Sequence, residues 1–178
     1  MKIVYLSLGS NIGDREQMLQ SALDRLHAPD LRIKRISPVY ETEPLDFKEQ
    51  RLFLNMVVEA ETDLFPMMLL SRIQRIELQL GRRRTGPPKG PRTIDIDILL
   101  HGGSTVHSAR LEIPHPRMHE RRFVLAPMVD LAPNLRHPQL RRTMRDLLSQ
   151  LESQKVRKVD YTPRAPSTAA SPGGKPAF

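Results

Sequence analysis

Apolar and polar positions repeat with two different periods along the first hundred residues. A period of about two predicts four strands, over 2–8, 31–40, 53–62 and 93–100. A period of three to four predicts two helices between them. One begins at a capping Asp14 and ends near His27, and the other has Pro66 in its first turn and Gly81 at its end. The resulting order, β-α-β-β-α-β, predicts an α+β fold of the ferredoxin-like sandwich type.

The chain beyond the fourth strand is less regular. The segments "HGGS" and "ARLEIPH" predict an added hairpin, and "RRFVLAPMVDLAP" and "TMRDLLSQLES" predict two short C-terminal helices. From Thr162 onward Pro, Ser, Ala and Gly dominate, a composition that cannot form a packed core. We therefore expect one domain over 1–161 and a disordered tail over 162–178.

Composition limits the classes of function. The 178 residues include no cysteine, which excludes disulfides and thiolate metal sites and fits a cytoplasmic location. No apolar run approaches the length of a membrane span, and "MKIVYLSLGS" is typical of a first strand rather than a signal peptide. The net charge of +8 indicates an anionic partner, such as a nucleic acid, an anionic membrane surface or a phosphorylated small molecule.

Much of the positive charge lies in one segment, "GRRRTGPPKGPR". Its basic residues are Arg82, Arg83, Arg84, Lys89 and Arg92, and half of its positions are Gly or Pro. This composition predicts a mobile basic loop rather than a helix face. One interpretation is a solvated surface loop. The other is a phosphate-binding loop, because guanidinium groups match phosphate oxygens and the loop leads directly into the fourth strand.

That strand raises a question of its own. In "TIDIDILL" three isoleucines alternate with Asp95, Asp97 and Leu99, so both carboxylates share one face while the isoleucines face the core. Two charges about 6.6 Å apart repel by about 2.5 kcal/mol at an effective dielectric constant of about 20. A solvated outer face would tolerate them. Carboxylate oxygens at this spacing also suit Mg²⁺, which removes the repulsion and can clamp a polyphosphate.

Other motifs are ambiguous. "SLGSNIGD" is a weak match to a phosphate-binding turn because no Lys follows its glycines, and a tight strand-to-helix connection explains it better. His115 and His119 are spaced like a zinc pair, but neighbouring prolines argue against one regular helix, and His115, Arg117 and Arg121 also suit a phosphate site. The last ambiguous group comprises Phe53, Asn55 and Phe123. Two aromatic rings and an amide suit either the binding of a flat heterocycle or a place in the protein core.

Five segments together resemble one enzyme family. "YETEPL", "FLN", "RIELQLGRRR", "GPRTIDIDILLHG" and "IPHPRMHERRFVLAPMVDLAP" are similar, in order and spacing, to the 6-hydroxymethyl-7,8-dihydropterin pyrophosphokinases of folate biosynthesis. The likeness runs from Met1 to about Leu151. It implies an enzyme that transfers the pyrophosphoryl group of ATP to the hydroxymethyl oxygen of the pterin and releases AMP. It also implies small-molecule substrates rather than nucleic acid or membrane, and we expect a monomer.

The resemblance assigns roles to individual residues. It implies that two Mg²⁺ ions are held by Asp95 and Asp97, which act in catalysis together with Arg82 and Arg92. Contacts with ATP are implied for Gln74, Glu77, Arg84, Ile98, His115 and Arg121. Contacts with the pterin are implied for Thr42, Glu43, Leu45, Phe53, Asn55 and Phe123. The chain departs from the usual family pattern at Asp46, Pro88, Lys89 and Pro116, which affects the expected closure of the basic loop.

Two other functions remain open from the residues alone. A ferredoxin-like module that binds nucleic acid fits the positive charge, but only 4% of the residues are aromatic and no RNA-binding strand motif is present. A different metal-dependent nucleotidyl or phosphoryl transferase fits the paired aspartates. Assay of AMP against ADP separates these alternatives.

Overall fold

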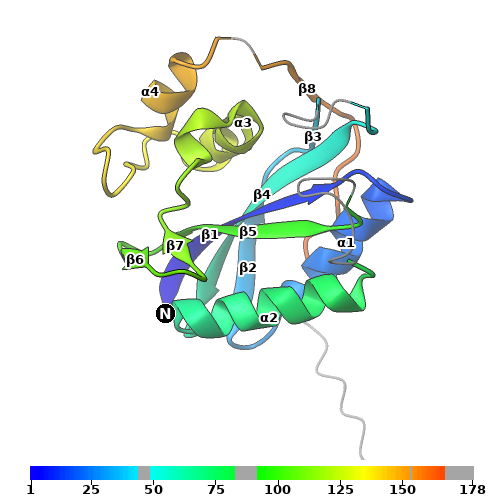
Figure 1. The fold of residues 1–178 in the computed structure, drawn as a ribbon, viewed down its shortest axis with the longest axis horizontal. Coiled ribbons are helices and arrows are strands. Elements are labelled where there is room, and N and C mark those ends of the chain that lie inside the picture. Colours follow the sequence, from blue (N-terminus) through cyan, green and yellow to red (C-terminus); the bar gives the residue numbers. More distant parts are fainter. Residues whose placement is uncertain (44–48, 83–91, 153, 167–178) are drawn as a thin grey trace, which may run out of the picture.

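The computed structural model describes residues 1–43, 49–82, 92–152 and 154–166. The first part of the chain forms β1 (Lys2–Ser10), α1 (Arg15–Leu26), β2 (Leu31–Ile36), β3 (Tyr40–Thr42), β4 (Phe53–Thr62), α2 (Pro66–Gln79) and β5 (Asp95–His101). The rest forms β6 (Val106–His107), β7 (Glu112–Ile113), the 3-10 helix η1 (Met118–Glu120), α3 (Arg122–Leu131), α4 (Met144–Ser149) and β8 (Val156–Lys158). The fold is a mixed one, of helices packed on an antiparallel sheet (Figure 1).

β1 is an inner strand of the sheet, between β5 and β4. The strand order is β5-β1-β4-β3-β8, and β2 pairs with another part of β4. Every pairing in this sheet is antiparallel, so side chains directly opposite one another on neighbouring strands share a face. Ser7 of β1 pairs with Val57 and Asp97, and Gly9 pairs with Asn55 and Asp95. The register of β1 thus aligns polar residues from three strands.

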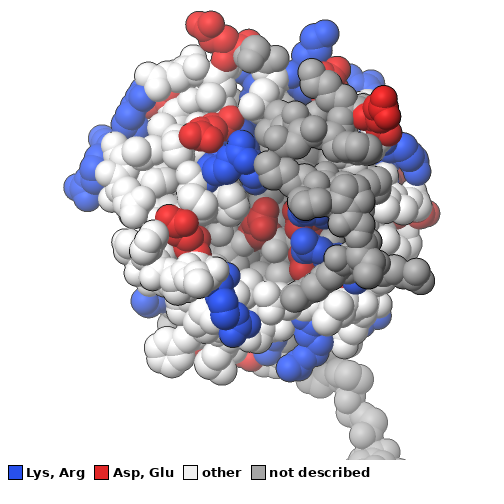
Figure 2. Space-filling model, in the orientation of Figure 1, with Lys and Arg blue, Asp and Glu red and all other residues white. Residues whose placement is uncertain are grey.

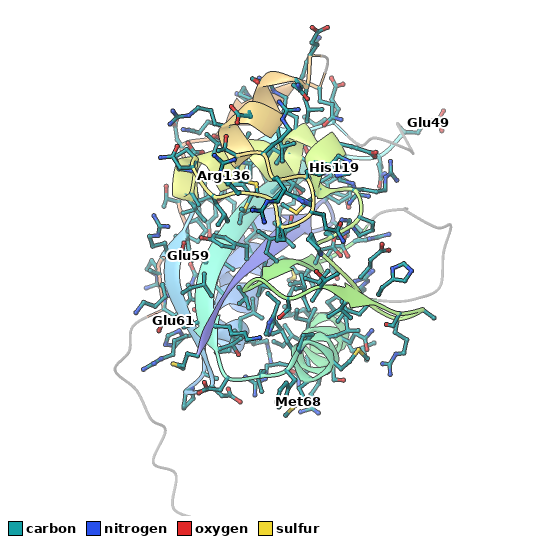
Figure 3. All side chains as sticks on the ribbon, turned by 90° about the vertical axis from the view of Figure 1, so that its left-hand side faces the viewer. Glu49, Glu59, Glu61, Met68, His119 and Arg136 are labelled. Atoms are coloured by element: carbon teal, nitrogen blue, oxygen red, sulfur yellow. The ribbon has the colours of Figure 1, made fainter. Side chains whose placement is uncertain are left out.

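Helices cover the two faces of the sheet differently. One face packs on α1 and α2 through a continuous apolar cluster, which includes Ile94, Ile96 and Ile98 as the alternation predicted. A second cluster, which includes Leu99, packs the opposite face against α3 and α4. Figure 3 shows the sheet between α2 and the C-terminal helices. The face that carries the aspartates is therefore partly covered, so it is not the solvated outer face that the sequence left open.

The helix ends follow from local chemistry. The Asp14 side chain accepts a hydrogen bond from the Gln17 amide, which satisfies one of the free N–H groups in the first turn of α1. Pro66 occupies the first turn of α2, where no N–H is required. Gly81 follows α2 with φ of 84°, a left-handed conformation that glycine adopts without steric cost. These three predictions are confirmed. No helix within the described ranges is long and apolar enough to cross a membrane.

Two parts of the fold differ from the prediction. The single strand expected over 31–40 is interrupted between β2 and β3, where Pro38 offers no N–H to a partner strand. The sequence analysis also missed β8, which pairs with β3 at the edge of the sheet. Of the predicted tail, 167–178 lie outside the described residues. In its described part Arg164 exchanges two hydrogen bonds with Gln20 of α1.

The difference between buried and exposed leucines provides a test of this core. Leu23 of α1 is fully buried, whereas Leu78 of α2 is 58% exposed. We expect Leu23→Ala to lower the free energy of unfolding by about 2–5 kcal/mol, because it leaves a cavity. Leu78→Ala should change it by less than about 1 kcal/mol. Urea unfolding measures both, and equal losses would contradict the packing described here.

Candidate active site

A cavity of about 400 Å³ opens where β1, β3, β4 and β5 meet α2 and α3. On the surface, acidic and basic side chains gather around a hollow in this face (Figure 2). Thirteen residues that the sequence analysis assigned to the site line the cavity: Thr42, Glu43, Phe53, Asn55, Gln74, Glu77, Arg82, Arg92, Asp95, Asp97, His115, Arg121 and Phe123. The fold thus brings together side chains that lie more than 80 positions apart in the sequence.

Three assigned residues are not in this set. The side chain of Ile98 packs in the core with α1 and α2 and does not line the cavity. Leu45 and Arg84 lie outside the described residues, as do the departures from the family pattern at Asp46, Pro88 and Lys89.

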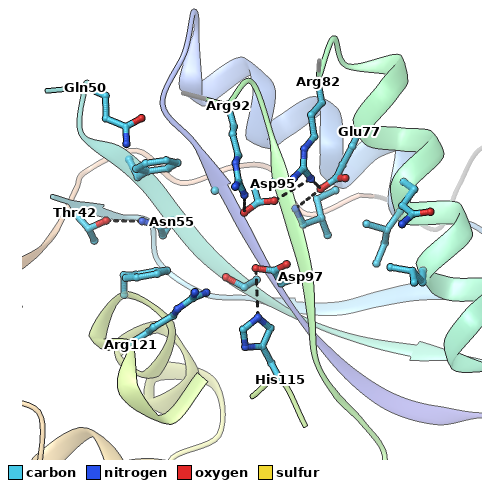
Figure 4. Close-up of a pocket in the computed structure, with 18 of the residues that line it drawn as sticks. Thr42, Gln50, Asn55, Glu77, Arg82, Arg92, Asp95, Asp97, His115 and Arg121 are labelled. Atoms are coloured by element: carbon cyan, nitrogen blue, oxygen red, sulfur yellow. Dashed lines mark hydrogen bonds and ion pairs between the residues drawn. The ribbon is translucent and has the colours of Figure 1, made fainter. Parts of the chain in front are cut away.

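Asp95 lies between two arginines. Arg82 Nη1 is 3.0 Å from Asp95 Oδ1, and Arg92 Nη1 is 2.8 Å from Asp95 Oδ2 (Figure 4). The Glu77 carboxylate also contacts Arg82, and its Oε1 accepts a hydrogen bond of 2.8 Å from the Ile96 amide at the start of β5. Burial raises the pKa of Glu77. Arg82 follows α2 and Arg92 precedes β5, so both ends of the α2–β5 connection bind the carboxylate of Asp95, the first residue of β5.

Asp97 lies two residues further along the same face. Enclosure by the cavity walls, and then the nearby Asp95 carboxylate, raise the pKa of Asp97 to about 7. The Asp97 side chain is 38% exposed, so water in the cavity screens part of both effects, and the pKa is still raised. The charged form of Asp97 is disfavoured in the folded protein and would be stabilised by a cation that enters the cavity.

An irregularity in β5 places His115 beside Asp97. The register with β1 shifts between Tyr5 and Leu6, so Leu99 has no partner in β1, and its carbonyl accepts a hydrogen bond from the His115 amide. The imidazole Nε2 then lies 3.9 Å from Asp97 Oδ2. Nδ1 accepts a hydrogen bond from the Arg117 amide, which leaves the proton on Nε2. Burial, and then Arg121, lower the pKa of His115 to about 4, so the ring is a neutral donor.

The opposite end of the cavity is shaped for a flat group. Phe53 of β4 and Phe123 of α3 both line it, and the Arg121 guanidinium lies 5.7 Å from the centre of the Phe123 ring. Between these elements Asn55 Nδ2 donates a hydrogen bond of 2.6 Å to Thr42 Oγ1 (Figure 4). Both of these polar residues are buried. Aromatic surfaces next to a fixed amide provide stacking and directional hydrogen bonding.

The sequence analysis missed several residues of the cavity. Gly9 and Ser7 line it from β1, because they lie on the same face as the two aspartates. Strand alternation alone puts them on one face, but only the pairing of β1 with β5 and β4 identifies that face. Leu70 and Ile73 of α2, which pack in or against the apolar core, also contribute to the lining.

Asn11 was missed although it belongs to the "SLGSNIGD" motif. Its Oδ1 accepts a hydrogen bond from the Arg92 backbone N–H, and the backbone N–H of Asn11 donates to the Arg92 carbonyl. Its Nδ2 donates to Gln50 Oε1 at 2.9 Å and to the Arg51 carbonyl at 3.2 Å. This buried side chain therefore joins the segment that precedes β4 to the segment that precedes β5. The second half of the motif serves as a structural connection, since positions 11–14 do not line the cavity, whereas its first half contributes Ser7 and Gly9 to the lining.

The zinc interpretation of the two histidines finds no support. His119 packs edge-on against His137, with 6.1 Å between the ring centres, whereas His115 faces the cavity. Within the described ranges, no group of three or more His, Cys, Asp or Glu side chains could hold a metal ion. The cavity instead offers the carboxylates of Asp95 and Asp97, besides those of Glu43 and Glu77, together with several cationic groups. This combination suits a ligand that carries both phosphates and a divalent cation.

Comparisons with known proteins agree with this geometry. The profile of the family described as 7,8-dihydro-6-hydroxymethylpterin-pyrophosphokinase (HPPK) matches residues 5–133. A "2-amino-4-hydroxy-6-hydroxymethyldihydropteridine pyrophosphokinase" of Bacillus subtilis is 47% identical over 130 residues, which are 72% of this chain and 77% of that protein. A protein of the same name from Aquifex aeolicus is 40% identical over 146 residues, which are 82% of this chain and 90% of that protein.

Some similar proteins are much longer than this chain. The "Folic acid synthesis protein fol1" of Schizosaccharomyces pombe is 45% identical over 157 residues, which are 88% of this chain but 21% of that protein. The crystal structure of Plasmodium falciparum HPPK-DHPS with pterin and p-hydroxybenzoate matches with a TM-score of 0.67 at 20% identity. That match covers 84% of this chain and 41% of the other. This last similarity supports the fold alone. The family match and the bacterial relatives show that the chain belongs to the 7,8-dihydro-6-hydroxymethylpterin-pyrophosphokinase family.

Proposed function

We propose that this chain transfers the β,γ-pyrophosphoryl group of ATP to the hydroxymethyl oxygen of 6-hydroxymethyl-7,8-dihydropterin, producing AMP and the pterin diphosphate. One observation carries the proposal. A single cavity holds a fixed amide beside aromatic rings at one end and two carboxylates beside arginines at the other. The two ends match the two reactants, and the bacterial relatives are named as pyrophosphokinases of a hydroxymethyl dihydropteridine.

The pterin end would bind the flat ring system between Phe53 and Phe123. Stacking on both faces removes apolar surface from water and sets the plane of the ring. Asn55 and Thr42 lie at the same end, where their polar groups would read the edge of the ring, together with Glu43. Such contacts orient the hydroxymethyl group toward β5.

The phosphate end suits Mg²⁺. This ion usually takes one or two protein carboxylates and completes its shell with phosphate oxygens and water, so two aspartates without a third protein ligand are sufficient. The oxygens of Asp95 and Asp97 are hard donors on one strand face. The raised pKa of Asp97 indicates that a bound cation would stabilise its charged form. We propose that these residues hold two Mg²⁺ ions. When bound, the ions would neutralise phosphate charge and help to align the reacting groups.

The remaining residues of the cavity would position the nucleotide and neutralise its phosphate charge. Arg82 and Arg92 both bind the Asp95 carboxylate, which is also the proposed ligand of the cation. When a metal ion takes over those carboxylate oxygens, the two guanidinium groups can contact phosphate instead. Arg121 and His115, as a neutral Nε2 donor, would contact the nucleotide from the opposite wall, with Gln74 from α2. No side chain need act as nucleophile, because in-line attack by the pterin oxygen requires mainly positioning and charge stabilisation.

We also propose that the fold is of the ferredoxin-like type. Antiparallel neighbours in the order β5-β1-β4-β2, with α1 and α2 on one face, support this assignment. The cytoplasmic location, the monomeric state and the disordered tail stay predictions from the sequence.

Product analysis tests the proposed reaction. With ATP, Mg²⁺ and the hydroxymethyl pterin, we expect AMP formation that depends on the pterin. Asp97→Ala should lower it by about 100-fold or more and weaken MgATP binding, because one metal ligand is lost. Asp160→Ala, at an exposed aspartate, is the matched control. Formation of ADP would indicate another kinase, absence of both products would favour a binding module, and normal turnover by Asp97→Ala would refute the metal assignment.

Arg92 allows chemistry to be separated from pterin binding. Arg92→Ala removes the guanidinium but keeps the backbone groups that bind Asn11. We expect the single-turnover rate to fall by about 100-fold, since a preorganised charge facing the phosphates is lost, while pterin affinity changes little. Arg145→Ala, at an exposed arginine of α4, should leave both values unchanged. An unchanged single-turnover rate for Arg92→Ala would exclude the assigned role.

The raised pKa of Asp97 predicts a pH-dependent effect on stability. Because its pKa in the folded protein lies near 7, above the unfolded value, the fold loses stability through this group as pH rises from about 4 to about 7. In metal-free buffer, Asp97→Asn should therefore stabilise the protein more at about pH 8 than at about pH 5. Urea unfolding at both pH values measures this difference, with Asp160→Asn as control. A difference that is the same at both pH values would show that the pKa of Asp97 is not raised.

A further inference from the structure

Gly9 lies at the centre of the cavity floor. In the register of β1, it pairs with Asn55 of β4 on one side and with Asp95 of β5 on the other. It is therefore positioned between the residue assigned to the pterin and a residue assigned to the metal. Its φ is not in the left-handed region, in contrast to Gly13, so its backbone conformation is open to any L-residue.

Space, rather than conformation, explains the glycine. A Cβ placed on Gly9 would lie 2.8 Å from Asn55 Oδ1 and 3.7 Å from Phe53 Cδ1. The second distance is an ordinary van der Waals contact. The first is shorter than a carbon–oxygen contact tolerates, so any side chain at position 9 requires the Asn55 carboxamide to move.

Asn55 has little freedom to move. Its side chain is buried, and its Nδ2 donates a hydrogen bond of 2.6 Å to Thr42 Oγ1, which belongs to the neighbouring strand β3. Rotation away from a Cβ at position 9 would stretch or break this bond. Within the described ranges no group donates a hydrogen bond to Asn55 Oδ1, so this oxygen is an acceptor that the site can offer to a ligand.

We propose that Gly9 is a positioning residue that determines recognition of the heterocycle by acting through Asn55. The missing side chain leaves Oδ1 of Asn55 directed over the floor of β1, where it accepts a hydrogen bond from an N–H group at the edge of a flat ring. A larger residue displaces the carboxamide and removes this acceptor. The inference rests on the proposed function, because the ligand it concerns is the pterin.

Binding measurements on Gly9→Ala test the inference. We expect the dissociation constant for 6-hydroxymethyl-7,8-dihydropterin to rise about tenfold or more, the effect of disturbing a hydrogen bond in a desolvated site. The dissociation constant for MgATP should stay within about twofold of the wild-type value, because the Cβ points at Asn55 rather than at Asp95. Gly103→Ala is the matched control, since Gly103 is exposed and a Cβ there meets nothing within 4 Å.

A double-substitution cycle distinguishes action through Asn55 from a general effect on the fold. Asn55→Ala removes the oxygen that the new Cβ would meet, so adding Gly9→Ala to it should change pterin affinity by less than about twofold. An equal loss in both backgrounds would overturn the inference, as would unchanged pterin affinity in Gly9→Ala or a parallel loss of MgATP affinity.

The wild-type protein separates this test from that of the proposed function. If the wild type does not bind the hydroxymethyl pterin at all, the proposed function fails. If the wild type binds it and Gly9→Ala binds it equally well, the function stands and the role of Gly9 fails. Thermal unfolding of each variant without ligand checks that both comparisons are made on folded protein.

Discussion

The hydrogen-bond register of β1 with its two neighbours is the constraint on which the rest of the site depends. It aligns Ser7 with Asp97, and Gly9 with both Asn55 and Asp95, across three strands that are distant in sequence. Because side chains alternate with a period of two, a slip of one residue would turn a whole row of polar groups into the apolar core beneath α1 and α2. The isoleucines that alternate with the aspartates prevent this slip, since their burial stabilises only one register.

The negative charges on this face of the sheet are only partly balanced within the protein, and a ligand can balance the rest. Two carboxylates on one strand face, with Glu77 behind them, repel one another, and the arginines on either side of Asp95 offset only part of that repulsion. Burial, and then the nearby Asp95 carboxylate, raise the pKa of Asp97. A magnesium–polyphosphate complex carries both charges that such a floor can use, since the cation satisfies the carboxylates and the phosphates satisfy the arginines.

A buried asparagine connects the two halves of the cavity. Asn11 binds the backbone of Arg92, which leads into β5, and the segment at Gln50 and Arg51, which leads into β4. An unsatisfied amide in this position would be costly, so these bonds fix where both segments begin. The same β1 end thus supplies both an open floor at Gly9 and a link at Asn11. Both roles are structural, in a glycine-containing turn that has no phosphate-binding lysine.

The sequence by itself determined the local elements, the faces of the helices and the chemistry of "GPRTIDIDILLHG". Hydrophobic periodicity and end signals such as Asp14, Pro66 and Gly81 act over a few residues and can be read directly. The resemblance to a family then indicated most residues that line the cavity. The break at Pro38 was also a local signal, because proline has no N–H for a strand pairing, and the sequence analysis overlooked it. Tertiary structure alone decided that β8 completes the sheet edge. It also decided that Gly9 faces Asn55, because pairing between distant strands depends on the packing of the whole sheet rather than on any local pattern.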